Sequence, residues 1–235
     1  MSHRVPAPSA DLGAAEVPLP ALGAHHLVHV LRLAEGAPLV VFDAGLEIDA
    51  TLARAGASWI ARRVGVVRAG VTGAALTLAY GLPKGDKLDV VLRQATELGV
   101  GRVVLLDCAR SVVKLTADRA AKRLERLERV VEQAARQSGR ADVPRLMGPL
   151  SVAAAAAQLA DHTIWLLHTE GGVSLAGAPA RAPLAVFVGP EGGFDHAEIE
   201  ALDGATRVTL GPSVLRTETA APVACALALH RLGVL

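Results

Sequence analysis

From residue 74 onward, short apolar runs alternate with longer stretches of helical periodicity. Buried strands are expected at residues 76–80, 102–106, 163–168, 184–188 and 207–210. Helices are expected at residues 84–98, 117–138, 152–159, 195–202 and 218–232. Strands separated by helices predict an α/β domain built on a parallel sheet.

The residues before this alternation have a different pattern. Several short strands and one brief helix at 25–31 are expected between Val5 and Arg68, with a hairpin turn at Asp43-Ala-Gly45. The run 68–73 is rich in glycine and poor in core-forming residues, which indicates a boundary. The sequence therefore predicts a small β-rich domain at 1–70 and an α/β domain at 74–235.

Composition narrows the class of protein. Hydrophobic residues make up 51% of the chain and aromatic residues only 3%, so the core must consist of alanine, valine and leucine. The longest apolar runs fall well short of the roughly 20 residues that span a bilayer, and the amino terminus lacks an apolar signal core. We therefore expect a cytoplasmic protein. Cys108 and Cys225 lie far apart in sequence, so neither a disulfide framework nor a metal site is expected.

The net charge is only +1, but basic residues gather locally. Between Arg102 and Arg140 there are ten Lys or Arg residues and five acidic ones. This excess fits contacts with nucleic-acid phosphates. Part of it also fits a solvated helix face, because bases and acids alternate there at helical spacing. Since few aromatic residues are available to stack on bases, recognition by shape and phosphate is the expectation.

The sharpest local signal is a strand that runs into the segment Gly189-Pro-Glu-Gly-Gly193. Glycines let backbone amides close on a ligand, and Asp195 with Glu198 can cap the next helix. A tight strand-to-helix turn without any ligand fits equally well. A triphosphate is disfavoured because no Gly-Lys-Ser/Thr ending is present and Glu191 repels phosphate. A ligand with hydroxyl or amine donors, or with positive charge, suits this loop better.

A second loop of the same kind runs from Leu210 to Ala220 and contains Arg216-Thr-Glu-Thr219. Helix capping explains Thr217 and Glu218, but it does not explain Arg216, whose charge is unfavourable at a helix amino terminus. Two such loops at the carboxyl ends of strands in one sheet predict a shared ligand crevice.

These two loops resemble the cofactor-loop signatures of the SPOUT-class methyltransferases that modify uridine N3 in small-subunit ribosomal RNA. Other stretches agree with that family in the same order, from Arg4 to Leu232: His25-His-Leu27, Val30-Leu-Arg32 with Gly36, Lys84-Gly-Asp-Lys87, Glu97-Leu-Gly-Val100, Arg110-Ser-Val-Val-Lys114, and Gln137-Ser-Gly-Arg140 with Pro144. The resemblance implies a PUA-like β-barrel followed by an α/β domain with a carboxyl-terminal trefoil knot, a feature rare among proteins. It also implies S-adenosylmethionine as cofactor, ribosomal RNA or the small ribosomal subunit as partner, and a homodimer.

The methyl transfer to uridine N3 that the resemblance implies suggests roles for individual residues. Arg216 is the candidate for stabilising negative charge on the uracil, and Glu218 for accepting the N3 proton or orienting Arg216. The cofactor-binding candidates are His168, Glu170, Gly189, Pro190, Glu191, Gly192, Gly193, Leu210, Gly211, Val214, Leu215, Thr219 and Ala220. The RNA-binding candidates are Arg4, His25, His26, Arg32, Lys84, Arg110, Lys114 and Arg140.

Two departures from the family pattern and two rival functions stay open. Arg136 replaces an acidic residue, and Cys108-Ala109 replaces a hydroxyl and acid pair. One rival is a related methyltransferase that acts on a ribose 2′-hydroxyl or a transfer RNA base, which mass spectrometry of the product would reveal. The other is a non-catalytic RNA-binding protein of ribosome assembly, which would have no affinity for S-adenosylmethionine. A dinucleotide-dependent dehydrogenase is disfavoured because no Gly-x-Gly-x-x-Gly follows the first strand of the α/β region.

Overall fold

The computed structural model describes residues 3–85, 87–111 and 117–235, and the chain divides into two compact units. Unit 1 comprises the residues up to Thr72 together with Glu132–Val143, and unit 2 comprises Gly73–Val131 and Pro144–Leu235. The grouping of Glu132–Val143 with unit 1 has no signal in the sequence, because the helical pattern runs through that point without a break.

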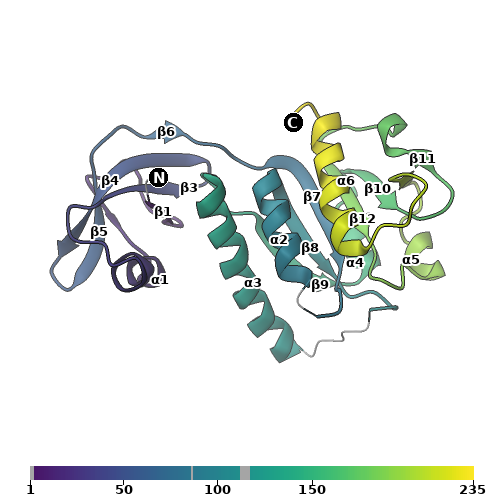
Figure 1. Cartoon of the computed structure of the whole chain (residues 1–235), viewed down its shortest axis with the longest axis horizontal. Helices are drawn as coiled ribbons and strands as arrows, with labels where there is room; N and C mark the ends of the chain where they lie inside the picture. The colour runs from purple at the N-terminus through teal and green to yellow at the C-terminus, as the bar shows by residue number, and fades with distance from the viewer. Residues whose placement is uncertain (1–2, 86, 112–116) are drawn as a thin grey trace. The chain divides into compact units, whose positions relative to one another are not determined.

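Unit 2 is built on a seven-stranded sheet in the order β11-β13-β10-β12-β7-β8-β9 (Figure 1). Every pairing in it is parallel, which confirms the predicted α/β class. The strands are β7 (Ala74–Gly81), β8 (Val100–Leu106), β9 (Arg145–Leu150), β10 (Thr163–Leu167), β11 (Val173–Ser174), β12 (Leu184–Val188) and β13 (Thr206–Thr209). The sequence pattern did not predict β9 and β11: β11 has only two residues, and glycine and proline interrupt β9.

Helices cover both faces of this sheet. They are α2 (Lys87–Leu98), α3 (Ala117–Ser138), α4 (Val152–Gln158), α5 (His196–Glu200) and α6 (Thr217–Arg231), with a short 3-10 turn, η2 (Leu175–Gly177). One core joins the sheet to α2, α6 and the middle of α3, and a second core joins the opposite face to α4 and α5. Helix α2 packs one apolar face into the first core, since Leu88, Val91, Leu92 and Ala95 are all fully buried.

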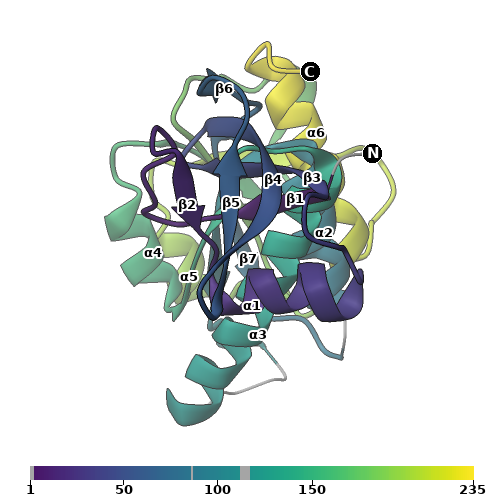
Figure 2. The ribbon, with the colours of Figure 1, turned by 90° about the vertical axis from the view of Figure 1, so that its left-hand side faces the viewer.

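Unit 1 contains a second sheet in the order β1-β3-β4-β5-β2, with β6 paired to β4 (Figure 2). Its elements are β1 (His3–Pro6), β2 (Glu16–Pro18), α1 (Ala21–His25), the π-helix η1 (His26–Val30), β3 (Pro38–Asp43), β4 (Leu46–Ala55), β5 (Ser58–Arg63) and β6 (Arg68–Ala69). The predicted hairpin joins β3 to β4, and Ala44 and Gly45 both take positive φ in its turn. An aliphatic core that includes Val5, Leu27 and Ile48 holds the unit together.

None of the helices in the described residues has the length and apolar character needed to cross a bilayer. Within the same residues, no three His, Cys, Asp or Glu side chains gather where they could hold a metal ion.

Candidate functional site

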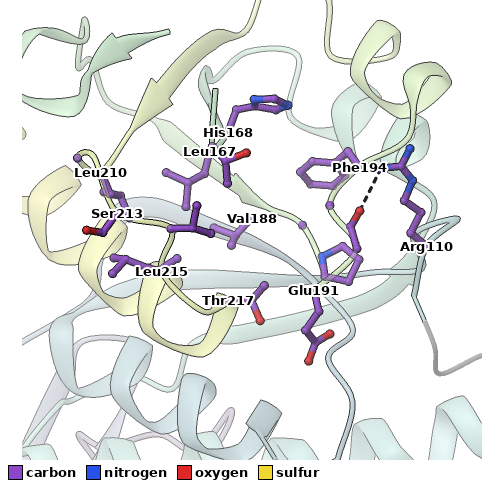
Figure 3. A pocket seen from close by; sticks show the side chains of 18 of the residues that line it. Arg110, Leu167, His168, Val188, Glu191, Phe194, Leu210, Ser213, Leu215 and Thr217 are labelled. Atoms are coloured by element: carbon purple, nitrogen blue, oxygen red, sulfur yellow. Dashed lines mark hydrogen bonds between the residues drawn. The ribbon is translucent and has the colours of Figure 1, made fainter. Parts of the chain in front are cut away.

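A pocket of about 320 Å³ opens at the carboxyl ends of β10, β12 and β13 (Figure 3). This edge of a parallel sheet is where open α/β folds bind small molecules, because the connecting loops diverge there. Leu167, Val188 and Phe194 form part of its apolar wall. The full lining is Arg110, Leu167, His168, Thr169, Val188 to Phe194, Leu210 to Leu215, Thr217 and Ala220.

The first wall of the pocket is the loop Gly189–Gly193, which follows β12. Its turn is closed by the Gly193 amide, which donates to the Pro190 carbonyl oxygen at 2.8 Å. Gly193 has φ +69°, a conformation that costs other L residues about 1 kcal/mol or more. Asp195 then caps α5 in a reciprocal capping box with Glu198, as the sequence predicted. The glycines therefore shape a backbone-lined turn at the mouth of the pocket.

The end of β7 contacts both the glycine loop and the start of α6. An ideal Cβ at Gly81 would lie 2.6 Å from the backbone nitrogen of Pro190, so only glycine permits this approach of strand and loop. The neighbouring Tyr80 donates its hydroxyl hydrogen to Thr217 Oγ1 at 3.2 Å. Burial raises the pKa of Tyr80 to about 12, so this hydroxyl stays protonated and keeps donating at neutral pH.

The second wall is the loop from Leu210 to Arg216, which leads into α6. Arg216 occupies the N-cap position without a side-chain capping bond, and its side chain is exposed. Val214 in the same loop is 76% exposed in this single chain. Arg216 and Glu218 are not among the pocket-lining residues, whereas Thr217 between them is.

Three charged side chains meet beside the pocket. The Lys87 Nζ atom lies 3.1 Å from a carboxylate oxygen of Glu191 and 3.1 Å from one of Glu218. Burial acts to raise the pKa of Glu191, but its own backbone hydrogen bond and Lys87 hold that pKa below the usual range. A backbone hydrogen bond, and then Lys87, lower the pKa of Glu218. Hydrogen bonds to Glu191 and Glu218 raise the pKa of Lys87, so all three groups are charged at neutral pH.

Two further side chains close the pocket. Arg110, which we grouped with RNA contacts, lines the pocket and donates from Nη1 to the Gly192 carbonyl oxygen at 3.1 Å (Figure 3). His168 lies at the end of β10, and its Nδ1 atom is 2.6 Å from the Glu170 carbonyl oxygen. Glu170 is exposed and not among the lining residues, and the same is true of Thr219.

The structure brings eleven of the thirteen cofactor candidates into one pocket, all except Glu170 and Thr219. Thr169, Pro212 and Ser213 also line the pocket, and they lie inside the segments 168–170 and 210–215 along which the sequence places the cofactor. Sequence reasoning did not assign the other five lining residues to the cofactor: Arg110, Leu167, Val188, Phe194 and Thr217. All of these except Arg110 lie within two residues of a predicted segment, so slightly longer segments would have included them. For Arg110 no local signal points to the glycine loop, because the two are 82 positions apart.

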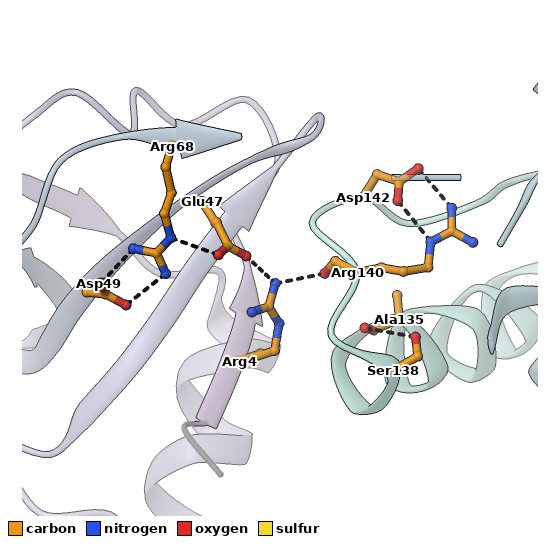
Figure 4. Close-up of polar contacts among 8 residues, drawn as sticks. All are labelled: Arg4, Glu47, Asp49, Arg68, Ala135, Ser138, Arg140 and Asp142. Atoms are coloured by element: carbon orange, nitrogen blue, oxygen red, sulfur yellow. Dashed lines mark hydrogen bonds and ion pairs between the residues drawn. The ribbon is translucent and has the colours of Figure 1, made fainter. Parts of the chain in front are cut away.

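The RNA-binding candidates differ sharply in exposure. Arg4 pairs with Glu47 at 2.7 Å and also donates to the Arg140 carbonyl oxygen (Figure 4). The Arg140 side chain is only 3% exposed and is bonded through two nitrogens to both oxygens of Asp142. Such buried and paired guanidinium groups serve structure better than they serve phosphate binding.

The other candidates of this set include free surface positions. His25, Arg32 and Lys84 are exposed, and His26 is half-buried. Burial, and then the charge of Arg136, lowers the pKa of His26, so it is mostly neutral at pH 7. Lys114 lies outside the described residues.

The comparisons with known proteins agree with this site. Residues 72–229 match the RNA methyltransferase domain family. The chain is 34% identical over 213 residues to the ribosomal RNA small subunit methyltransferase E of Bacillus subtilis, covering 83% of this chain and 82% of that protein. The chain therefore belongs to the RNA methyltransferase family, which confirms the predicted enzyme class.

Two solved structures resemble the whole chain. One is a ribosomal RNA small subunit methyltransferase E from Neisseria gonorrhoeae bound to S-adenosylmethionine, with 27% identity, a TM-score of 0.84 and coverage of 99% of this chain and 98% of that one. The other is a Legionella pneumophila protein, described as a methyltransferase and solved with the same cofactor, with 26% identity, a TM-score of 0.87 and coverage of 98% of both chains.

Proposed function

We propose that this protein transfers the methyl group of S-adenosylmethionine to N3 of a uridine in small-subunit ribosomal RNA. The observation that carries the proposal is the pocket at the carboxyl edge of the unit 2 sheet, whose two walls are the two family-signature loops. The relatives named for small-subunit methylation share this region of the chain.

The pocket fits the cofactor in size and chemistry. Its volume of about 320 Å³ is within the range of small-molecule sites. Apolar side chains such as Leu167, Phe194 and Leu215 suit an adenine ring, and the backbone of both loops offers polar groups to hydroxyls and amines. The Glu191 carboxylate lines the pocket, and its negative charge favours a ligand that carries a cationic group. When bound, S-adenosylmethionine supplies the methyl group on a sulfonium.

Arg216 is the proposed catalytic residue. N3 attacks only after it loses its proton, and the negative charge then spreads to the uracil carbonyl oxygens. Arg216 is exposed between the pocket residues Leu215 and Thr217, where its guanidinium can meet that charge. The base must leave its stack to reach this point, because base pairing hides N3.

Of the two roles considered for Glu218, orientation of Arg216 is better supported than proton acceptance. Its carboxylate is paired with Lys87, and its lowered pKa makes it a weak base. The charge of Arg216 also contributes to that lowering, so the two side chains interact. We assign the loss of the N3 proton to solvent.

The remaining expectations belong to the same proposal. Unit 1 is proposed as a PUA-like RNA-binding domain, and the carboxyl-terminal part of unit 2 as a trefoil knot. A homodimer is supported by exposed apolar side chains on the second loop and on α6, namely Val214, Leu215, Val223 and Leu227. We expect the enzyme to act in the cytoplasm, where ribosomal subunits assemble.

Product analysis tests this function. Purified protein is incubated with small-subunit ribosomal RNA, or with assembled subunits, and isotope-labelled S-adenosylmethionine. We expect the label in N3-methyluridine after digestion to nucleosides and mass spectrometry. A ribose-methylated nucleoside, or label on transfer RNA instead, would assign the chain to a related activity. No transfer to any RNA would leave a non-catalytic binding protein.

A further inference from the structure

Lys87 contacts the glycine loop of the candidate cofactor site and also the start of α6, the helix that follows the second wall. It lies in the first turn of α2, whereas its partner Glu191 belongs to the glycine loop and its partner Glu218 to the first turn of α6. In sequence the two partners are 104 and 131 positions away from Lys87. One ammonium group therefore contacts two segments that are both far from it in sequence.

The two carboxylates need a cation between them. Since each has an oxygen 3.1 Å from the same nitrogen, those oxygens are at most about 6 Å apart, a distance at which like charges interact strongly. With Lys87 present, both contacts are attractive. Without it, the carboxylates of the glycine loop and of the start of α6 would repel each other.

Helix α2 is a firm base for this contact. Leu88 next to Lys87 is fully buried. In the same first turn, Asp89 accepts two hydrogen bonds from Arg126 of α3, at 2.6 and 2.7 Å. The backbone amide of Lys84, just before α2, also donates to the Glu191 carboxylate at 3.4 Å. The Leu88 and Asp89 contacts, which involve no lining residue of the pocket, thus set the position of Lys87.

We propose that Lys87 is a positioning residue of the methyl-transfer site, which holds the glycine loop and the start of α6 at the spacing that cofactor binding requires. It acts through Glu191 and through Glu218 next to the lining residue Thr217, and it is not itself a lining residue. This inference rests on the proposed function, because the ligand is S-adenosylmethionine or its product.

The first test measures the affinity for S-adenosylhomocysteine by calorimetry in the full-length protein. We expect Lys87→Met to weaken binding by about tenfold, in the range of couplings between contacting charges. The matched control is Arg93→Met, which removes an exposed cation from the same helix and should bind as the wild type does. Thermal unfolding checks that both variants are folded.

The second variant separates repulsion from a general loss of structure. In Lys87→Met/Glu218→Gln one of the two carboxylates is neutral, so binding should return to within about threefold of the wild type. Acid should likewise restore affinity in Lys87→Met, because protonation removes the repulsion. In the wild type both carboxylates have lowered pKa values, so their ion pairs persist at neutral pH and acid can only weaken them.

These measurements decide whether Lys87 positions the two segments. Unchanged affinity in Lys87→Met would overturn the inference, and so would a double variant that binds no better than the single one. If the wild-type protein fails to bind S-adenosylhomocysteine, the proposed function itself is wrong, and the inference falls with it.

Discussion

Two arginines of unit 1 and two arginines of unit 2 are placed in opposite ways. In unit 1, Arg4 and Arg140 are largely buried and hydrogen-bonded to carboxylates or carbonyl oxygens (Figure 4). At the pocket of unit 2, Arg216 is exposed and Arg110 lies at the rim (Figure 3). The residue type is the same, but a guanidinium already desolvated and paired cannot serve a ligand without losing its partner. The difference separates structural arginines from those available to RNA or substrate.

The largest effect is expected for Arg216→Ala. Removing the charge that stabilises the uracil anion should lower kcat for methylation by about 100-fold or more, in the range seen for lost transition-state donors. Affinity for S-adenosylhomocysteine should change little, because Arg216 is not among the lining residues. Single-turnover methylation and calorimetry measure the two quantities.

Arg207→Ala is the control for that experiment, since it removes another exposed arginine from unit 2. Its rate should match the wild type. A normal rate in Arg216→Ala would show that the exposed arginine at the pocket is not catalytic.

Arg140→Met tests the structural role of the buried arginines in unit 1. The change leaves the Asp142 carboxylate without its bidentate partner, so the free energy of unfolding should fall by about 3 kcal/mol. Urea denaturation measures this, with Arg145→Met, at an exposed position on β9, as the control. If Arg140→Met is as stable as the wild type and binds RNA less well, Arg140 contacts phosphate after all.

The sequence alone does not separate the buried arginines from the exposed ones. Hydrophobic periodicity located the helices and the main strands, because burial of one face controls both. The two loops could be found because their glycines and polar strings are local in sequence. The sequence does not reveal the partners of Arg4 and Arg110, because the Arg4–Glu47 and Arg110–Gly192 contacts depend on tertiary packing. The partner of Arg140 is only two residues away, but in the sequence Asp142 does not differ from other charged loop residues.

Gly193→Ala, in the glycine loop, should have a smaller effect than the arginine substitutions above, and we expect it on cofactor affinity. The positive φ of Gly193 strains an alanine by about 1 kcal/mol, which the loop can relieve by moving away from its binding conformation. We expect the affinity for S-adenosylhomocysteine to fall by roughly fivefold. Gly204→Ala has a comparable φ of +82° but lies outside the pocket, so it should lose stability without losing affinity. Equal affinity losses in both variants would argue against a binding role for the loop.

The smallest effect is expected for Arg32→Gln in unit 1. Arg32 is exposed, so its removal should leave the free energy of unfolding within about 0.5 kcal/mol of the wild type. If it contacts one phosphate, RNA affinity should fall a few-fold and the salt dependence of binding should lose about one unit of slope. Titrations at several salt concentrations measure this. An unchanged slope would remove Arg32 from the RNA contacts.

A calorimetric titration of the purified wild-type protein with S-adenosylhomocysteine tests the central claim most directly. If the loops after β12 and β13 form the cofactor site, the titration should show saturable binding with one ligand per chain, and S-adenosylmethionine added beforehand should compete. Absence of saturable binding for both compounds would contradict the account, whatever RNA the protein binds.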